Sequence, residues 1–358
     1  MFKTNRIIFL VVSCFCLFNC FNKDNGRLNK NTITFTKFIS KDSLFFKKTY
    51  EFKEGAVGAI HALDSNLILF NNGSKNDNPF FYNYSINNNK ISKGYINKGK
   101  GPNEALGGMT SGLVNNTLWL YDITLKKIIT ISNINELIND DYLLFREYPI
   151  KERFYMISLK DSLNFYGVGS FNTKPKIQEI ELTTNKEVDS FGFFESYPKK
   201  IPFSAYKSAH ESFIFIKSIS RDKIVLAYRF TDAIEIFDLK TRESKVIQGP
   251  EVYNTQFTSI DAGGNNFIMG VTEETRRSFV NGTVTDKYIY LAYSGSRFNT
   301  INSYLSNTVY VYDWNGNPIK KFLLDREILS LTVSKNNKTM YAYDVSTGFI
   351  VESNINLE

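Results

Sequence analysis

Cysteine and histidine are almost missing from this chain of 358 residues. All three cysteines lie within the first 20 residues, and the only histidines are His61 and His210. Without a thiol after residue 20, the rest of the chain needs no disulfide and has no thiolate for catalysis or metal binding. Two isolated histidines also lack the spacing of a histidine-rich zinc site. We therefore expect no metal and no cofactor.

Long apolar runs and helical periods are scarce as well. The longest apolar run, Ile7–Phe18, covers 12 residues, which is too short to cross a bilayer of about 30 Å as a helix. Lys3 and Arg6 precede this run, and a polar stretch follows it. This order is typical of a secretory signal peptide. The nearest candidate for a helix, Ile134–Tyr142, is interpreted as a loop or a single helical turn.

The signal-like segment ends in a cysteine. Leu17–Cys20 resembles the end of a bacterial lipoprotein signal, in which the cysteine is lipidated and becomes the first mature residue. Cys14 fits the motif by letter but leaves an apolar run of only about six residues, so we predict lipidation at Cys20. The alternative is an ordinary secretory signal. With lipidation at Cys20, residues 1–19 are predicted to be a signal peptide. Residues 20–31, rich in Asn and Lys, are predicted to form a tether.

A lipidated cysteine implies a place in the cell. Several acyl chains on one residue hold a protein firmly to a membrane, at about 0.8 kcal/mol per buried CH₂. We expect an outer-membrane lipoprotein of a bacterial cell envelope, either periplasmic or surface-exposed. Lys23 and Asp24, just after Cys20, loosely resemble the surface-export signals of Bacteroidetes lipoproteins.

The net charge does not indicate nucleic-acid binding. The chain carries +7, and removal of Lys3 and Arg6 with the signal leaves +7 − 2 = +5. The basic residues occur as scattered pairs, such as Lys126-Lys127 and Lys320-Lys321, with no continuous track. Such pairs at hairpin ends are typical of solvated sheet edges. We expect a monomer whose partner is a protein or a glycan.

One short pattern recurs six times: a strand that ends in an aromatic residue and often an aspartate, then a tight polar turn and a second strand. We call it the hairpin motif. Its copies are Phe81–Ser85, Leu118–Asp122, Ile177–Glu181, Ile234–Asp238, Val309–Asp313 and Met340–Asp344. Repeated hairpins at this scale indicate a β-propeller. Residues 32–358 are therefore predicted to be an all-β, six-bladed β-propeller.

The hairpin motifs are unevenly spaced. The longest interval, between Asp238 and Asp313, predicts an insertion at Val252–Thr285. The shortest, between Asp313 and Asp344, leaves too little chain for a four-stranded blade. We therefore expect the amino-terminal strand near Ile33–Ile39 to close the last blade, which would tie the two ends of the ring together.

The aspartates of the motif are interpreted as turn formers. An aspartate at the start of a tight turn accepts hydrogen bonds from backbone N–H groups, and Gly316 supplies the positive φ that such a turn needs. We assign this role to Asp122, Asp238, Asp313 and Asp344, and not a catalytic one.

Four segments resemble the TolB-like six-bladed β-propeller family, which consists mostly of exported Bacteroidetes lipoproteins. They are Gly99–Glu104, Val225–Asp238, Lys287–Gly295 and Val309–Lys321. The first resembles the family's Gly-x-Gly-Pro-x-Glu corner, and the last its Tyr-Asp-Trp-x-Gly-x-Pro hairpin. The resemblance implies the fold and the envelope location, and the family implies no agreed chemistry.

The Gly99–Glu104 segment is interpreted as a structural corner, made by Gly99, Gly101, Pro102 and Glu104. A phosphate-binding loop needs a different spacing before a helix. Glu104 is expected to close the corner by accepting backbone hydrogen bonds.

Candidate ligand-binding residues follow from propeller geometry, because loops at one rim of the channel build the site. Arg229 and Arg297 are candidate donors, and Tyr206 and Tyr293 are candidate stacking faces. Packing within or between blades is the alternative for each.

The sequence shows no catalytic residues: it has no Gly-x-Ser-x-Gly nucleophile elbow. His61 and His210 would serve as acid and base only if the ring brought them together. We therefore predict a non-enzymatic, lipid-anchored binding module of unspecified ligand. The alternatives are a lactonase- or lyase-like enzyme that uses the channel and a structural partner of an outer-membrane complex.

Overall fold

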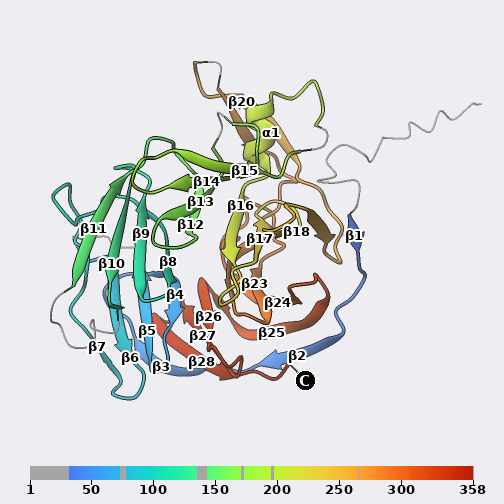
Figure 1. Cartoon of the computed structure of the whole chain (residues 1–358). Coiled ribbons are helices and arrows are strands. Elements are labelled where there is room, and N and C mark those ends of the chain that lie inside the picture. Colours follow the sequence, from blue (N-terminus) through green and yellow to red (C-terminus); the bar gives the residue numbers. More distant parts are fainter. Residues whose placement is uncertain are drawn as a thin grey trace, which may run out of the picture.

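The computed structural model describes residues 32–72, 78–134, 143–170, 173–194, 197–264 and 266–357. Six sheets surround a common centre (Figure 1). The first strands of the six sheets, β4, β8, β12, β16, β22 and β26, contact one another in turn around the ring, and β26 meets β4. The predicted six-bladed propeller is therefore confirmed.

Each blade is built from strands that follow one another along the chain. Blade one contains β4 (Val57–Ala62), β5 (Asn66–Asn71), β6 (Phe81–Ser85) and β7 (Lys90–Ile91). Blade two contains β8 (Gly108–Val114), β9 (Thr117–Asp122), β10 (Lys127–Ser132) and β11 (Leu144–Pro149). Blade three contains β12 (Met156–Leu159), β13 (Asn164–Val168), β14 (Ile177–Glu181) and β15 (Glu187–Phe191).

The other three blades include strands from the start of the chain. Blade four contains β16 (Ser212–Ile216), β17 (Lys223–Tyr228), β18 (Ala233–Asp238) and β19 (Ser244–Gln248), with β1 (Ile33–Thr34) at its edge. Blade five contains β22 (Phe279–Val284), β23 (Tyr288–Tyr293), β24 (Ser306–Asp313) and β25 (Pro318–Ile328), with β2 (Ser40–Leu44) at its edge. Blade six contains β26 (Ser330–Val333), β27 (Thr339–Asp344), β28 (Phe349–Asn354) and β3 (Lys47–Glu51).

The core lies between adjacent blades. The second strand of blade one, β5, is buried along its whole length because its neighbours cover both of its faces. Ile68 and Phe70 of this strand pack with Leu118 and Leu120 of blade two in one apolar cluster. Burial of apolar area on both faces of every blade, at about 25 cal/mol per Å², is what holds the ring together.

Ring closure uses a different segment from the predicted one. The last blade is completed by an amino-terminal strand, but that strand is β3, which pairs antiparallel with β28. The predicted residues, Ile33–Ile39, do not reach blade six. Within them only Ile33 and Thr34 form a strand, and it runs parallel to β19 of blade four.

The start of the described chain is therefore an arm across three blades. It joins blade four through β1, then blade five through β2, which runs parallel to β25, and finally closes blade six. Phe35 and Phe38 pack between blades four and five, and the Phe38 ring lies 4.6 Å from that of Tyr310. These contacts fix the arm along the outer edges of blades four and five, before its last strand completes blade six.

The hairpin motifs occur once in each blade but not on the same strand. They form the third strand in blades one, three, four and five, and the second strand in blades two and six. A shift from third to second strand shortens the interval between motifs, and the reverse shift lengthens it. This alternation, together with the insertion, accounts for the uneven spacing.

The aspartates of the motif form turns, as predicted. Asp122 accepts from the backbone N–H groups of Thr124 and Leu125. Asp238, Asp313 and Asp344 each likewise accept hydrogen bonds from two backbone N–H groups of the turn that follows them. Gly316 has φ of +85°, the left-handed conformation that its turn requires.

Two elements lie outside the six blades. A short helix, α1 (Phe203–Ala209), precedes blade four, and the sequence did not indicate it. A two-stranded hairpin of β20 (Phe257–Asp261) and β21 (Phe267–Val271) precedes blade five. An insertion was predicted at Val252–Thr285, but that range is too long, because Phe279–Val284 is the inner strand of blade five.

Some predictions fall on residues that the structure does not describe. The signal peptide, the tether and both candidate lipidation sites, Cys14 and Cys20, lie outside the described residues, as do residues 135–142 of the candidate helical turn. Among the helices of the described ranges, none has the length and apolarity needed to cross a membrane.

Candidate functional site

The loops of blades three to five bring charged and aromatic side chains to one end of the channel. In an antiparallel sheet the start of the first strand and the end of the second strand lie at the same edge. Tyr155, Glu211 and Arg277 directly or nearly precede the first strands of these blades, and Arg229 directly follows the second strand of blade four. We call the group formed by Arg229, Arg277 and Glu211 the arginine mouth.

Arg229 is held firmly by its backbone and its side chain. Its N–H donates to the carbonyl of Glu211 at 2.9 Å, and its carbonyl accepts from the N–H of Ser278 at 2.7 Å. Its Nη1 lies 3.4 Å from Oε2 of Glu211. The guanidinium also lies over three aromatic rings, those of Tyr155, Phe213 and Phe230, at 5.2–5.8 Å from the ring centres. Such rings stabilise a cation that has lost much of its water.

Arg277 reaches the same region from blade five. Its Nε donates to Oγ of Ser303 at 3.2 Å, and its guanidinium lies 4.0 Å from the centre of the Phe298 ring. The described residues, which leave out short segments such as 195–196, give it no carboxylate partner. The arginine mouth therefore has two guanidinium groups and a single nearby carboxylate.

Burial shifts the charges of this group. It raises the pKa of Glu211 to about 8, since the carboxyl has lost most of its water. Burial and the charge of Arg277 lower the pKa of Arg229 to about 10, and burial lowers that of Arg277. At pH 7 both arginines still carry their charge, while Glu211 is biased toward its neutral form. The arginine mouth is thus a positive site with little internal compensation.

A buried ion pair lies next to this group, at the junction of blades three and four. Nζ of Lys176 lies 2.8 Å from Oε2 of Glu235, and their side chains are 3% and 2% exposed. The hydroxyls of Tyr228 and Ser244 also donate to Glu235. Lys176 and Glu235 balance each other's charge, so this pair is structural and offers no free group to a ligand.

Helix α1 covers this junction. Nζ of Lys207 donates to the carbonyls of Thr173 and Pro175, at 2.7 and 2.8 Å, and ties the helix to blade three. Burial lowers the pKa of Lys207 to about 8. Burial also lowers the pKa of His210 to about 4, so that ring is neutral near pH 7 and its Nδ1 donates to the carbonyl of Tyr206.

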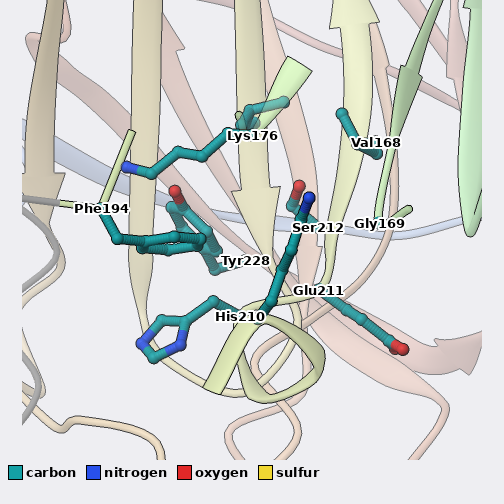
Figure 2. A pocket seen from close by; sticks show the side chains of 10 residues that line it. Val168, Gly169, Lys176, Phe194, His210, Glu211, Ser212 and Tyr228 are labelled. Carbon is teal, nitrogen blue, oxygen red and sulfur yellow. The ribbon is translucent and has the colours of Figure 1, made fainter. Parts of the chain in front are cut away.

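The cavity beneath α1 is small. Its volume is about 20 Å³, room for about one water molecule. In Figure 2 Lys176 and Phe194 lie beside Tyr228, and Glu211 extends away from His210. Glu211 therefore takes part in both places. It lines this cavity, and its carboxylate belongs to the arginine mouth.

The four predicted binding residues end up in different surroundings. Arg229 belongs to the arginine mouth. Arg297 is exposed on the loop after β23 and pairs with Glu274 at 3.2 Å. Tyr206 and Tyr293 are buried, and the Tyr293 ring stacks on that of Tyr310 at 4.4 Å. Because other side chains cover both tyrosine rings, neither ring offers an open face on which a ligand could stack. Of the four residues, only Arg229 lies in the arginine mouth.

The Gly99–Glu104 corner lies between blades one and two. Oε2 of Glu104 accepts from the N–H of Gly101 at 2.7 Å, and a Cβ on Gly99 would lie only 2.0 Å from that same oxygen. Pro102 and Glu104 border an open hollow of about 430 Å³. Because the Glu104 carboxylate already accepts a hydrogen bond from its own loop, we do not assign it a ligand-binding role in this hollow.

The two histidines are far from each other in the ring. Nε2 of His61 lies 2.8 Å from Oγ of Ser111, between blades one and two, whereas His210 packs under α1. The structure therefore does not assemble them into an acid–base pair. In the part of the chain that is described, no three His, Cys, Asp or Glu side chains are placed to hold a metal ion.

Sequence reasoning missed Glu211 and Arg277. Glu211 follows a helix that the sequence did not reveal, and Arg277 lies inside the range assigned to the insertion. The adjacent pair Arg276-Arg277, just before a strand, was the one available signal. Only the ring places Arg277 near Arg229, 48 positions earlier in the chain.

Comparisons with curated proteins and with solved structures give only distant likenesses. No curated protein matches this chain. Among solved structures, the β-propeller domain of Cps50 (Swd1) from Myceliophteria thermophila covers 87% of the chain at 12% identity, with 100% of that domain matched and a TM-score of 0.48. Hydrazine synthase from Kuenenia stuttgartiensis covers 86% at 10% identity, with 98% of its chain matched and a TM-score of 0.49. Both TM-scores are below 0.5, so neither likeness carries an argument about fold or function.

A family model gives the stronger result. The model described as TolB-like 6-blade propeller-like matches residues 34–336, which include all six blades at least in part. This range begins in the arm and ends within blade six. The chain therefore belongs to the TolB-like six-bladed propeller family.

Proposed function

We propose that this protein is an exported, lipid-anchored binding protein that holds an anionic ligand at the arginine mouth. The observation that carries the proposal is the arrangement of charges: the Arg229 guanidinium has the Glu211 carboxylate as its partner at 3.4 Å, and the Arg277 guanidinium, which acts on Arg229 through its charge, lies over Phe298 with no carboxylate partner among the described residues. An anion that bridges Arg229 and Arg277 would supply the missing countercharge. Carboxylate and sulfate groups match the planar donor set of arginine.

The surrounding rings favour a ligand with an apolar face next to its charge. Tyr155, Phe213 and Phe298 are half-buried, and each lies beside a guanidinium. Sugars combine an apolar ring face with charged substituents in acidic glycans. An acidic glycan is therefore our preferred ligand class.

Glycan binding tests this proposal directly. The purified domain would be titrated with polygalacturonate, chondroitin sulfate and neutral dextran. We expect saturable binding to at least one acidic glycan and none to dextran. Arg277→Met keeps the side-chain stem over Phe298 but removes the charge, and should weaken binding by about tenfold or more, the range for a lost charge-assisted hydrogen bond.

Arg297→Gln is the matched control, because it removes one exposed arginine from the same blade. It should leave binding unchanged apart from a small screening effect. Equal losses in the two variants would show that overall charge, and not the arginine mouth, is responsible. Release of shortened glycan during the same titration would favour the lyase-like alternative.

The proposed anchor has its own test. Cys20→Ala should move the full-length protein from the membrane fraction to the soluble fraction, whereas Cys14→Ala should leave it membrane-bound. Membrane retention of the Cys20→Ala variant would contradict lipidation at this residue. Protease treatment of whole cells would then distinguish a surface-exposed protein from a periplasmic one.

A further inference from the structure

The hairpin of β20 and β21 is a two-stranded sheet that stands outside the ring (Figure 1). One of its edges is covered. Ser204 and Ser208 of α1 accept hydrogen bonds from the backbone N–H groups of Phe267 and Met269, both at 3.2 Å. Helix α1 thus caps the outer edge of β21.

The register then fixes the direction of the backbone groups on β20. Phe267 lies opposite Asp261, and Met269 lies opposite Ser259. In an antiparallel ladder, residues whose N–H groups point outward face partners whose N–H and C=O groups also point outward. The backbone groups of Ser259 and Asp261 are therefore directed to the outer edge of β20.

This edge is open. In the ranges 32–72, 78–134, 143–170, 173–194, 197–264 and 266–357, no backbone or side-chain group pairs with the outward backbone groups of Ser259 and Asp261. Proteins commonly protect such an edge with a lysine, a proline or a bulge. Residues 257–261 contain no lysine or proline, and their pairing with β21 has no bulge.

The face beside the open edge is apolar. Ile260 and Ile268 lie directly opposite each other and are 51% and 38% exposed. They lie on the face opposite to Phe257, whose ring approaches Tyr206 of α1 at 6.4 Å. An added strand would gain both the outward hydrogen bonds and contact with these two side chains.

The residues around this hairpin are acidic, in contrast to the whole chain. Residues 246–275 contain four carboxylates, Glu251, Asp261, Glu273 and Glu274, and no lysine or arginine, although the full chain carries +7. Two of these carboxylates pair with Arg276 and Arg297. Asp261 and Glu273 are exposed and have no cationic partner among the described residues outside gaps such as position 265.

We propose that β20 binds an extended segment of a partner protein as an added strand, and that this segment alternates aliphatic with basic residues. Its backbone would pair with Ser259 and Asp261, and its aliphatic side chains would cover Ile260 and Ile268. Its cations would meet the carboxylates of Asp261, which accepts from the N–H of Gly263, and of Glu273. This site is separate from the arginine mouth, and its ligand has the opposite charge.

The probe is an eight-residue peptide of alternating lysine and valine. Fluorescence anisotropy would follow its binding to the folded domain. We expect saturable binding, no binding of a glutamate–valine peptide, and no binding of a lysine–valine peptide with N-methylated backbone. Amide hydrogen exchange should show new protection at Ser259 and Asp261 when the peptide is present.

Variants of one residue test the edge. Ser259→Pro removes an outward N–H while the inward hydrogen bonds of β20 stay intact, and should weaken binding at least about tenfold. Ser259→Ala retains the N–H and should bind like the wild type. Hydrogen exchange outside the hairpin would verify that both variants are folded.

Three results would overturn the proposal. The first is equal binding by Ser259→Pro and the wild type, and the second is failure of the wild type to bind the lysine–valine peptide. The third is concentration-dependent self-association that Ser259→Pro abolishes, which would assign the edge to a second copy of this chain. None of these results bears on glycan binding at the arginine mouth, so the two proposals fail independently.

Discussion

The junction between blades three and four and the junction between blades six and one are both packed with apolar side chains, and the first adds a buried ion pair to that packing. The first contains the buried pair Lys176–Glu235 beneath α1. The second is an apolar cluster in which Ile350 and Phe52 pack against blade one, close to the strand that closes the ring. Buried ion pairs contribute little net stability, because desolvation offsets their attraction, whereas apolar burial stabilises directly.

The two junctions therefore have different roles: one stabilises the ring, and the other positions the residues of the proposed binding site. The closing junction holds the two ends of the chain together and needs no specific chemistry. The charged junction lies directly beside the arginine mouth and fixes the loop that presents Glu211. Charged and hydrogen-bonded partners accept few alternative arrangements, so they define the position of α1 and its neighbouring loops.

The largest expected effect comes from breaking the charged junction. Lys176→Met leaves the buried Glu235 carboxylate without its cation, which should lower the free energy of unfolding by about 3–5 kcal/mol. The double variant Lys176→Met/Glu235→Gln should lose less, because no unpaired charge stays buried. Chemical denaturation of the wild type and both variants measures this. Unchanged stability of Lys176→Met would remove the distinction between the two junctions.

A smaller loss is expected at the apolar junction. Ile350 is 0% exposed, and Ile350→Ala should cost about 3 kcal/mol through lost burial and a residual cavity. Ile301 is 88% exposed, so Ile301→Ala is the matched control and should change stability by less than about 0.5 kcal/mol. Similar effects of the two substitutions would mean that closure does not depend on packing at this cluster.

The effect that is smallest over a single pH unit concerns the pH dependence of stability at the edge of the charged junction. Burial raises the pKa of Glu211 from 4.5 to about 8. Between these values the native state keeps a proton that the unfolded state has released, so its stability decreases as pH rises. Glu211→Gln should remove this contribution, which is at most about 1.4 kcal/mol per pH unit.

Denaturation of wild type and Glu211→Gln at several values between pH 5 and pH 8 provides the measurement. The quantity of interest is the difference between the two curves, because Lys207 titrates in both proteins. Parallel curves would show that Glu211 is ionised in the native state and that its charge compensates Arg229. The arginine mouth would then be less positive than we infer.

The repeat in the sequence was sufficient to predict the ring. Each hairpin motif combines a buried strand with a turn-forming residue, and both depend on local sequence alone. Asp122 and Asp313 accept from nearby backbone N–H groups, as expected for residues that act within a few positions. The motif did not reveal which strand of the blade it occupies, because the second and third strands are both buried on two faces and have the same pattern.

The candidate site was only partly predictable. Arg229 was identified because it was assigned to an inner strand of the fourth unit, but Glu211 follows a helix of seven residues that has no side-chain cap and no clear helical period. Tyr206 and Tyr293 were chosen because tyrosine rings often stack on ligands, but neighbouring side chains bury both rings. The burial of Tyr206 within α1 and of Tyr293 between blades depends on distant segments, which a local pattern does not record.

Strand period and turn chemistry act over a few residues, so they were enough to predict a ring of six blades with tight aspartate turns. Which amino-terminal segment closes the ring depends on long-range pairing, since Ile33–Thr34 and Lys47–Glu51 are both short strands and only their distant partners tell them apart. The tertiary structure also brought Arg277 close enough to Arg229 for its charge to act on that side chain. Their proximity is a property of the closed ring, in which loops of successive blades converge on the same axis.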